Sequence, residues 1–120
     1  MRDIFISSDD AASLIKDGDT VGLVGGGGGL VEASTLHEAV ENRFLSTGYP
    51  RNITCLHSLG IGDRKERGMN RFAHEGLVSR VIGGHWVWSP RMQQMAKNHF
   101  SCILCNINES TRSHSISPKH

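Results

Sequence analysis

The sequence predicts an α/β fold with an open, mainly parallel sheet flanked by helices. Short apolar runs of strand length alternate along the chain with segments whose apolar residues recur at helical spacing, which is typical of parallel strands joined by crossover helices. The first apolar run ends in five consecutive glycines, residues 25–29, at an expected junction between strand and helix. The chain has 120 residues, enough for one domain or part of one.

The first half of the chain is expected to form two helices and two strands. Ser7 and Ser8 precede two acidic residues and an apolar repeat that continues to Gly18, which predicts a short capped helix. Residues 20–24 predict a buried strand, covered on both faces of the sheet. A second strand is expected at 53–56. Between these strands a helix should follow the glycines directly, end near Gly48 and bury Ala33, Leu36, Val40 and Phe44.

The second half begins with a loop and continues with one apolar segment and one helix. Residues 60–68 mix glycines with charges, which is typical of a surface loop. Apolar residues gather at 77–82 and end at the Gly83–Trp86 segment. Ser89 is expected to cap a helix that begins at Pro90. The apolar stripe of this helix should carry Met92, Met95, Ala96 and His99.

The pattern changes at Phe100. Residues 100–120 are rich in Ser, Asn and His, and we interpret them as a poorly ordered tail after a domain segment of residues 1–99. A frameshift or a truncation would produce such a tail. Because a sheet of two or three strands leaves an edge and a helix face uncovered, we expect self-association. The tail contains Cys102-x-x-Cys105, His114 and His120, which are zinc-ligand types, but their spacing is short and we expect no metal.

Composition excludes several classes of partner. A net charge of +1 and a pI near 7.8 argue against a large basic face for nucleic acid. The first eight residues lack the pattern of a signal peptide, and glycines interrupt the longest apolar stretch well below the roughly 18 residues of a membrane span. Three cysteines without a secretion signal predict reduced thiols in the cytoplasm. We therefore expect a cytoplasmic protein that binds neither nucleic acid nor membrane.

The glycines Gly25, Gly26, Gly27, Gly28 and Gly29 form the principal candidate site. Without Cβ atoms their backbone N–H groups can approach a ligand closely, and a following helix would add free N–H groups and a partial positive charge. This pattern predicts an anion or oxyanion site. A P-loop is excluded because no lysine lies between residues 16 and 65. The dinucleotide fingerprint fails because its third glycine is missing in every frame. A tight turn that only packs helix against strand is the structural alternative.

Further motifs occur in an order that is more specific than the glycine run alone. They are Glu32-Ala33 after the glycines, DGDTV at 17–21, RFL at 43–45, PRNIT at 50–54, GDR at 62–64, Gly68, FAHEGL at 72–77, GHW at 84–86 and Pro90. Over residues 4–99 the chain resembles the N-terminal part of the family I coenzyme A transferases, in particular the acetate/propionate branch. The resemblance implies that the chain is an N-terminal fragment of a larger α/β domain.

The resemblance also implies a reaction. In that family a glutamate attacks an acyl-CoA thioester, CoA passes onto the enzyme as a glutamyl thioester, and a short-chain carboxylate then takes it. The nucleophilic glutamate lies in a later segment of the family's chain, so we expect no catalytic residue here. Glu32 and Glu75 are interpreted as carboxylates that begin helices and interact with their dipoles. CoA is a substrate, and no cofactor is expected. The full-length family also implies a homo-oligomer.

Two weaker candidates flank this site in the sequence. His85 and Trp86 are candidates for the wall of an acyl or pantetheine pocket, or for an aromatic core with a hydrogen-bonded histidine. Asp63, Arg64 and Arg67 are candidates for contact with the CoA phosphates, or for a solvated loop with internal ion pairs.

Two functional hypotheses remain. In the first, the chain supplies the glycine-loop oxyanion or CoA site of a CoA-transferase. In the second, it is a non-catalytic fragment, or a small anion-binding or interaction module.

Overall fold

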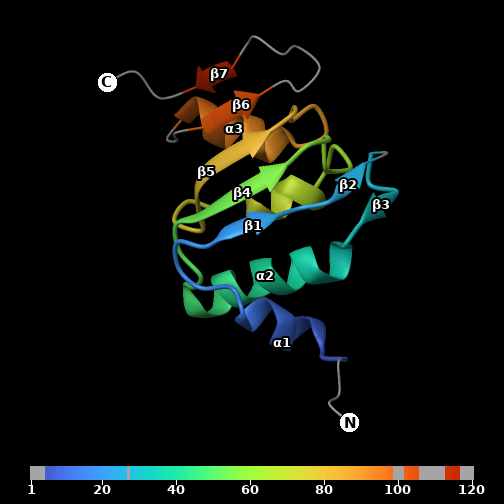
Figure 1. Cartoon of the computed structure of the whole chain (residues 1–120), viewed down its shortest axis with the longest axis vertical. Helices are drawn as coiled ribbons and strands as arrows, with labels where there is room; N and C mark the ends of the chain where they lie inside the picture. Colours follow the sequence, from blue (N-terminus) through green and yellow to red (C-terminus); the bar gives the residue numbers. More distant parts are fainter. Residues whose placement is uncertain (1–4, 27, 99–101, 106–112, 117–120) are drawn as a thin grey trace.

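The structure is a computed structural model, and it describes residues 5–26 and 28–98 together with the backbone of 102–105 and 113–116. Five strands form the main sheet in the order β1, β4, β5, β6, β7, and the first four are parallel whereas β7 is antiparallel to β6 (Figure 1). Their bounds are β1 Thr20–Gly22, β4 Ile53–His57, β5 Val78–Gly83, β6 Cys102–Cys105 and β7 Ser113–Ile116. The predicted α/β fold with a mainly parallel sheet is confirmed.

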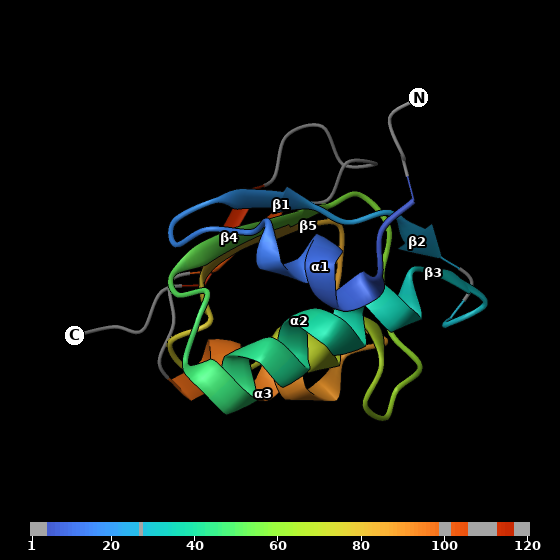
Figure 2. The same ribbon diagram turned by 90° about the horizontal axis from the view of Figure 1, so that it is seen from below.

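The helices lie on one side of this sheet. Figure 2 shows α1 (Ser8–Ser13), α2 (Ser34–Thr47) and α3 (Pro90–Asn98) below the strands. The core lies between these two layers and includes Ile53, Cys55, Val81, Phe72 and Met92, each at most 1% exposed. Because strand side chains alternate between faces, β4 buries Cys55 and leaves Leu56 46% exposed.

The prediction that the first strand is covered on both faces is wrong. In β1 Thr20 and Gly22 are exposed, Val21 is half-buried, and Val24 just beyond the strand is 86% exposed. The reason is that the described helices lie on one side of the sheet only, so the other face of β1 is open. The strand also lies at the sheet edge and pairs with β4 alone among the described strands. The apolar run therefore reflected one buried face and one open face.

The helix predictions hold for α1 and α3 with small changes. Ser7 is the N-cap of α1, and its hydroxyl accepts a hydrogen bond from the Asp10 N–H at 3.1 Å. This helix ends at Ser13, earlier than expected. In α3 Met92 and Ala96 are buried as predicted, whereas His99 lies outside the described residues. The Ser89 hydroxyl, expected to cap α3, instead donates to the Ile61 carbonyl oxygen at 2.5 Å.

The buried face of α2 differs from the predicted one. Val40 is buried as expected, but Leu36 is 43% exposed and the polar residues His37 and Glu41 are buried instead. Glu41 tolerates burial because its carboxylate accepts hydrogen bonds from Arg71 and His74, both outside the helix. The helix ends where predicted, at Gly48, whose left-handed φ of 80° allows its N–H to bond the Phe44 carbonyl oxygen.

Within the expected tail, the described backbone forms β6 and β7. The side chains of Cys102, Cys105 and His114, and all of His120, lie outside the described residues, so the interpretation of residues 100–120 stays a prediction.

Candidate functional site

The glycine run forms a small hairpin. β2 (Gly25–Gly26) pairs antiparallel with β3 (Val31–Glu32), directly after the carboxyl end of β1. Gly28 and Gly29 turn the chain with φ of 64° and 100°, values that favour glycine. Gly27 lies outside the described residues. A Cβ on Gly25 would lie 2.8 Å from the Val31 carbonyl oxygen, so the hairpin has no room for a side chain there.

This geometry corrects the expected link between glycines and helix. The run does not open directly into α2, because β3 lies between them and the helix begins at Ser34 after Ala33, which makes no side-chain cap hydrogen bond. Glu32 therefore belongs to a strand and does not begin a helix. The N–H groups of the α2 terminus therefore do not continue directly from those of the glycines, and their part in an anion site stays a prediction.

Those neighbours come from two segments that follow later in the chain. A Cβ on Gly28 would lie 3.2 Å from the Trp88 ring, and one on Gly29 would lie 3.2 Å from the Asp63 Cβ. The hairpin tip thus packs against the charged loop of residues 60–68 and against the turn before α3. Glycine is required here for close approach as well as for its φ values.

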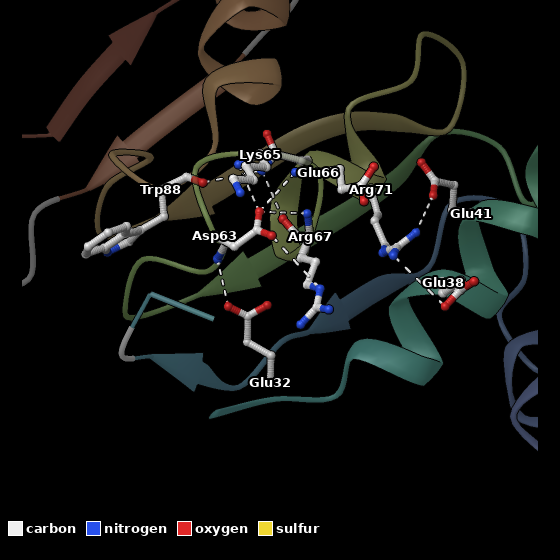
Figure 3. Close-up of polar contacts among 11 residues, drawn as sticks. Glu32, Glu38, Glu41, Asp63, Lys65, Glu66, Arg67, Arg71 and Trp88 are labelled. Atoms are coloured by element: carbon white, nitrogen blue, oxygen red, sulfur yellow. Dashed lines mark hydrogen bonds and ion pairs between the residues drawn. The ribbon is translucent and has the colours of Figure 1, made fainter. Parts of the chain in front are cut away.

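Glu32 fastens the hairpin to the charged loop (Figure 3). Its Oε2 accepts a hydrogen bond from the Gly62 N–H at 2.8 Å, across 30 residues of sequence. Its Oε1 is buried and has no hydrogen-bond partner. We name the contact between Glu32 and Gly62 the hairpin clasp. The contact is not predictable from the sequence, because no local pattern indicates that Glu32 and Gly62, 30 residues apart, would meet.

The charged loop is organised by Asp63. Its Oδ1 accepts from the backbone N–H groups of Lys65, Glu66 and Arg67 at 2.9, 2.9 and 3.0 Å (Figure 3). Desolvation raises the pKa of Asp63, but hydrogen bonds from the Arg67, Lys65 and Glu66 backbones outweigh it, so the pKa lies below its usual value. Asp63 therefore stabilises the loop through these hydrogen bonds. A contact between Asp63 and substrate stays a prediction.

Arg64 is presented at the surface beside the hairpin. Its guanidinium carbon lies 4.5 Å from the centre of the Trp88 ring, a cation–π contact that fixes its direction. Its backbone N–H donates to the Trp88 carbonyl oxygen at 2.8 Å, with φ at 66°. Trp88 therefore contacts both Gly28 and Arg64. The hairpin tip and Arg64 thus pack against the same ring, and an anion site that uses both stays a prediction.

Buried polar residues support the turn that carries Trp88. Asn70 is fully buried, and its amide donates to the Arg67 and Trp88 carbonyl oxygens at 3.0 and 3.3 Å while its Oδ1 accepts from the Arg91 N–H at 3.0 Å. Asn70 lies two residues after Gly68 in the 3₁₀ helix η1 (Gly68–Phe72), a helix that the sequence pattern does not predict. A single Asn in this segment is too weak a signal to predict such a role.

His85 and Trp86 lie in the turn between β5 and α3, near His57 and Gly60. Trp86 is buried, and its indole Nε1–H donates to His57 Nε2 at 3.3 Å, while His57 Nδ1 bonds the Leu59 carbonyl oxygen at 2.7 Å. Burial lowers the pKa of His57, with a smaller opposing effect from Leu59. His85 packs against Gly60. This arrangement favours the aromatic-core alternative for Trp86, and a substrate contact for His85 stays a prediction.

The remaining carboxylates near this region have structural roles. Glu41 accepts from Arg71 at 2.8 Å (Figure 3). Its other carboxylate oxygen accepts from His74 at 2.7 Å. Glu75 is exposed in the turn before β5 and does not begin a helix, which corrects its predicted position. The described residues contain no group of three or more His, Cys, Asp or Glu side chains able to hold a metal ion.

Two cavities flank the carboxyl end of β1, where α/β sheets usually bind ligands. One, of about 340 Å³, lies on the helix side of the strand; the other, of about 450 Å³, lies beside the carboxyl ends of β1, β4 and β5. Both include Leu23 and Val24, the residues that lead into the hairpin. Neither is lined by the predicted pocket residues His85, Trp86, Asp63 or Arg64.

Comparison with known proteins identifies the family. Acetate CoA-transferase YdiF of Escherichia coli (strain K12) is 38% identical over 94 residues, which are 78% of this chain and 18% of that protein. The crystal structure of acyl-CoA transferase YdiF from E. coli O157:H7, in a thioester complex with CoA, superposes with a TM-score of 0.79 at 37% identity over 83% of this chain and 21% of that one. The chain belongs to the family I coenzyme A transferases.

The name of another relative of this CoA-transferase segment gives a different substrate. Caffeate CoA-transferase of Acetobacterium woodii is 43% identical over 82 residues, 68% of this chain and 15% of that protein. The chain thus spans less than a fifth of the length of these curated relatives. No family model matches it. In the described part of the chain, no helix combines the length and the apolar character that crossing a membrane requires.

Proposed function

We propose that this chain supplies part of the substrate site of a CoA-transferase, which moves coenzyme A between short-chain acyl-CoA thioesters and carboxylates. The observation that carries the proposal is the glycine hairpin, clasped by Glu32 onto a loop that presents Arg64 beside it. Family membership supports the reaction, and the hairpin supports the place of binding.

In this proposal the backbone N–H groups of Gly28 and Gly29, and that of whichever of Gly25 and Gly26 does not donate to β3, face the reacting thioester. Attack on a thioester carbon places negative charge on its carbonyl oxygen, and fixed N–H donors stabilise that charge. Loss of one such donor typically lowers the rate about 10²–10³-fold. The clasp matters because it holds these donors still before the charge develops.

Arg64 and Arg67 are proposed to bind the phosphates of CoA. Both guanidinium groups are exposed on the loop that Asp63 organises, and the Trp88 ring already directs Arg64. Guanidinium groups form charge-assisted hydrogen bonds with phosphate oxygens, so two of them on one ordered loop form a suitable cradle. Asp63 itself is proposed to act only by shaping this loop.

We further propose that none of the described carboxylates is the nucleophile. Glu32 accepts from Gly62, Asp63 accepts from three backbone N–H groups, and Glu41 is paired with Arg71 and His74. Turnover then requires a carboxylate from another polypeptide segment.

The acyl group is proposed to be short, as in acetate or propionate, although the relatives' names differ in this respect. Cys55, a free and buried thiol whose pKa burial raises to about 12, agrees with a reducing cytoplasm.

Calorimetric titration of acetyl-CoA into the purified chain tests the proposal. Gly28→Ala should weaken binding about tenfold or more, because the added methyl group meets the Trp88 ring and displaces the hairpin tip. Gly18→Ala is the matched control, since Gly18 has a similar φ of 78° but no neighbour within 4 Å. Equal loss in both variants, or no binding by the unmodified chain, would support a non-catalytic interaction module instead.

A transfer assay with acetyl-CoA and propionate separates binding from turnover. We expect no propionyl-CoA from this chain alone, because the proposal assigns it no nucleophile. Turnover above background would show that a carboxylate of this chain reacts, and would overturn that part of the proposal.

A further inference from the structure

The cavity on the helix side of β1 has the properties of a ligand site. Its volume of about 340 Å³ lies within the usual range of small-molecule pockets. The walls come from α1, β1, α2 and η1, and include Ala12, Val21, Leu36, His37, Val40 and Phe72. No Asp, Glu, Lys or Arg lines it. A charged group placed inside would lack a partner, so the cavity suits an uncharged hydrocarbon group.

His37 is the polar exception in this apolar wall. Its side chain is 3% exposed, and its Nδ1 atom is buried without a hydrogen-bond partner. The ring packs edge-on against Phe72, with 5.4 Å between ring centres. Burial, and secondarily the positive charge of Arg71, lower the pKa of His37 to about 4, so the ring is neutral at pH 7. A neutral imidazole can donate or accept one hydrogen bond at each nitrogen, depending on its tautomer.

We propose that this cavity binds an uncharged hydrocarbon group of about six to ten carbon atoms that carries one neutral hydrogen-bonding substituent, with His37 as the partner of that substituent. An engineered apolar cavity of about 150 Å³ is enough to hold benzene, so a cavity of this volume takes a larger group. A two-carbon acyl group would leave most of it empty.

The cavity adjoins both ends of the glycine hairpin. Val24 immediately precedes β2 and Ala33 immediately follows β3, and both residues line the cavity. A ligand in the cavity would therefore lie next to the proposed thioester site. Because the proposed acyl group is short, the cavity is assigned to a separate hydrocarbon ligand and not to the acyl group itself.

Amide NMR titration of the 120-residue chain with benzene and with phenol tests the cavity directly. Both probes should shift the amides of Ala12, Val21, Leu36 and Val40 to saturation. His37→Leu should weaken phenol binding about five- to tenfold, the worth of one hydrogen bond, and leave benzene binding unchanged. Equal effects of His37→Leu on both probes would overturn the role of His37.

A matched pair of substitutions on α2 guards against indirect effects. Leu36→Phe adds volume at the cavity wall from a half-exposed position, and should abolish binding of both probes. Leu45→Phe makes the same change on the same helix at a residue that is 62% exposed and outside the cavity, and should leave binding intact. No saturable shift in the unmodified chain, or the same result for both variants, would contradict the proposed site.

Competition distinguishes this inference from the proposed function. Acetyl-CoA should shift the hairpin amides and leave phenol in place. If acetyl-CoA displaces phenol, the cavity belongs to the thioester site and the separate hydrocarbon site is overturned. If phenol binds but acetyl-CoA does not shift the hairpin amides, the proposed function falls and the cavity stands.

Discussion

At the scale of single residues, Glu32 shows how one side chain can order a backbone site. Its Oε2 bonds the Gly62 N–H at 2.8 Å, and this contact joins a two-stranded hairpin to a loop that lies 30 residues further along. A hairpin of two strands is marginally stable by itself in water. The geometry of the proposed site therefore depends on the clasp.

Removing the Glu32 carboxylate should lower the free energy of unfolding, because the Gly62 N–H loses its acceptor. We expect Glu32→Ala to lower the free energy of unfolding by about 1–2 kcal/mol, because the part-buried Gly62 N–H loses its partner. Glu32→Gln keeps an acceptor oxygen and should cost less than half as much. Glu38→Ala, which removes only a 4.0 Å ion pair of an exposed side chain, should change stability by less than about 0.5 kcal/mol in the same urea titrations. Equal losses for Glu32→Ala and Glu38→Ala would contradict the clasp.

His37 makes stability depend on pH. The unfolded chain binds a proton near the ordinary histidine pKa of 6.5, whereas the folded chain keeps His37 neutral down to about pH 4. Its contribution to stability is complete above pH 6.5 and falls as the pH drops from 6.5 toward 4, by about 3 kcal/mol in total. His57, whose pKa is also lowered, acts in the same direction.

Urea unfolding at several pH values between 7.5 and 4.5 measures this dependence. The unmodified chain should lose stability steadily below pH 6.5, and His37→Gln should flatten the slope in the same range. An unchanged slope in His37→Gln would show that other groups cause the loss.

At the scale of elements, the loop of residues 60–68 is fixed by close backbone contacts. A Cβ on Gly62 would lie 2.3 Å from the Trp88 carbonyl oxygen, and its φ of 146° is one that other residues rarely adopt. Gly62→Ala should therefore destabilise the chain by more than about 3 kcal/mol. Gly18→Ala, at a φ of 78° with open space around it, should cost only about 1 kcal/mol. Comparable thermal unfolding of the two variants would refute the close approach.

Element order could be predicted from the sequence because apolar period and helix caps are local signals. Three such predictions are confirmed: the N-cap at Ser7, the helix end at Gly48, and the buried stripe of Met92 and Ala96. The glycine hairpin could not be predicted, since its first strand consists of two glycines, which lack strand propensity. The burial of Glu41 in α2 depends on Arg71 and His74, which lie about 30 residues away.

The candidate site was only partly predictable for the same reason. The glycine run and Arg64 stood out by residue type, and the structure brings them together through Trp88. The role of Glu32 was misassigned, because a carboxylate before a helical pattern is usually a dipole partner, whereas here it bonds Gly62. A contact between residues 30 positions apart produces no local sequence pattern, so a single sequence does not predict it.

At the scale of the whole molecule, the described helices cover one face of the sheet and leave the other open (Figure 2). The open face carries Leu56 at 46% exposure and Val24 at 86%. Such a patch favours association with other apolar surfaces. This arrangement supports the expected self-association, which stays a prediction.

A lysine on this face should reduce self-association. Sedimentation velocity should show a larger share of monomer for Leu56→Lys than for the unmodified chain, because a charge in the contact surface opposes its burial. Leu45→Lys adds the same charge on the exposed side of α2 and should leave the distribution unchanged. A monodisperse monomer without any substitution would refute self-association through the open face.

The glycine hairpin is proposed to be where this CoA-transferase segment meets its thioester substrate. Amide NMR of the chain during titration with acetyl-CoA tests this proposal. We expect saturable shifts at Gly25, Gly26, Gly28 and Gly29, with Gly62 and Arg64 following because they touch the hairpin or its neighbour Trp88. Saturable shifts confined to other parts of the chain, with the hairpin amides unmoved, would contradict the claim.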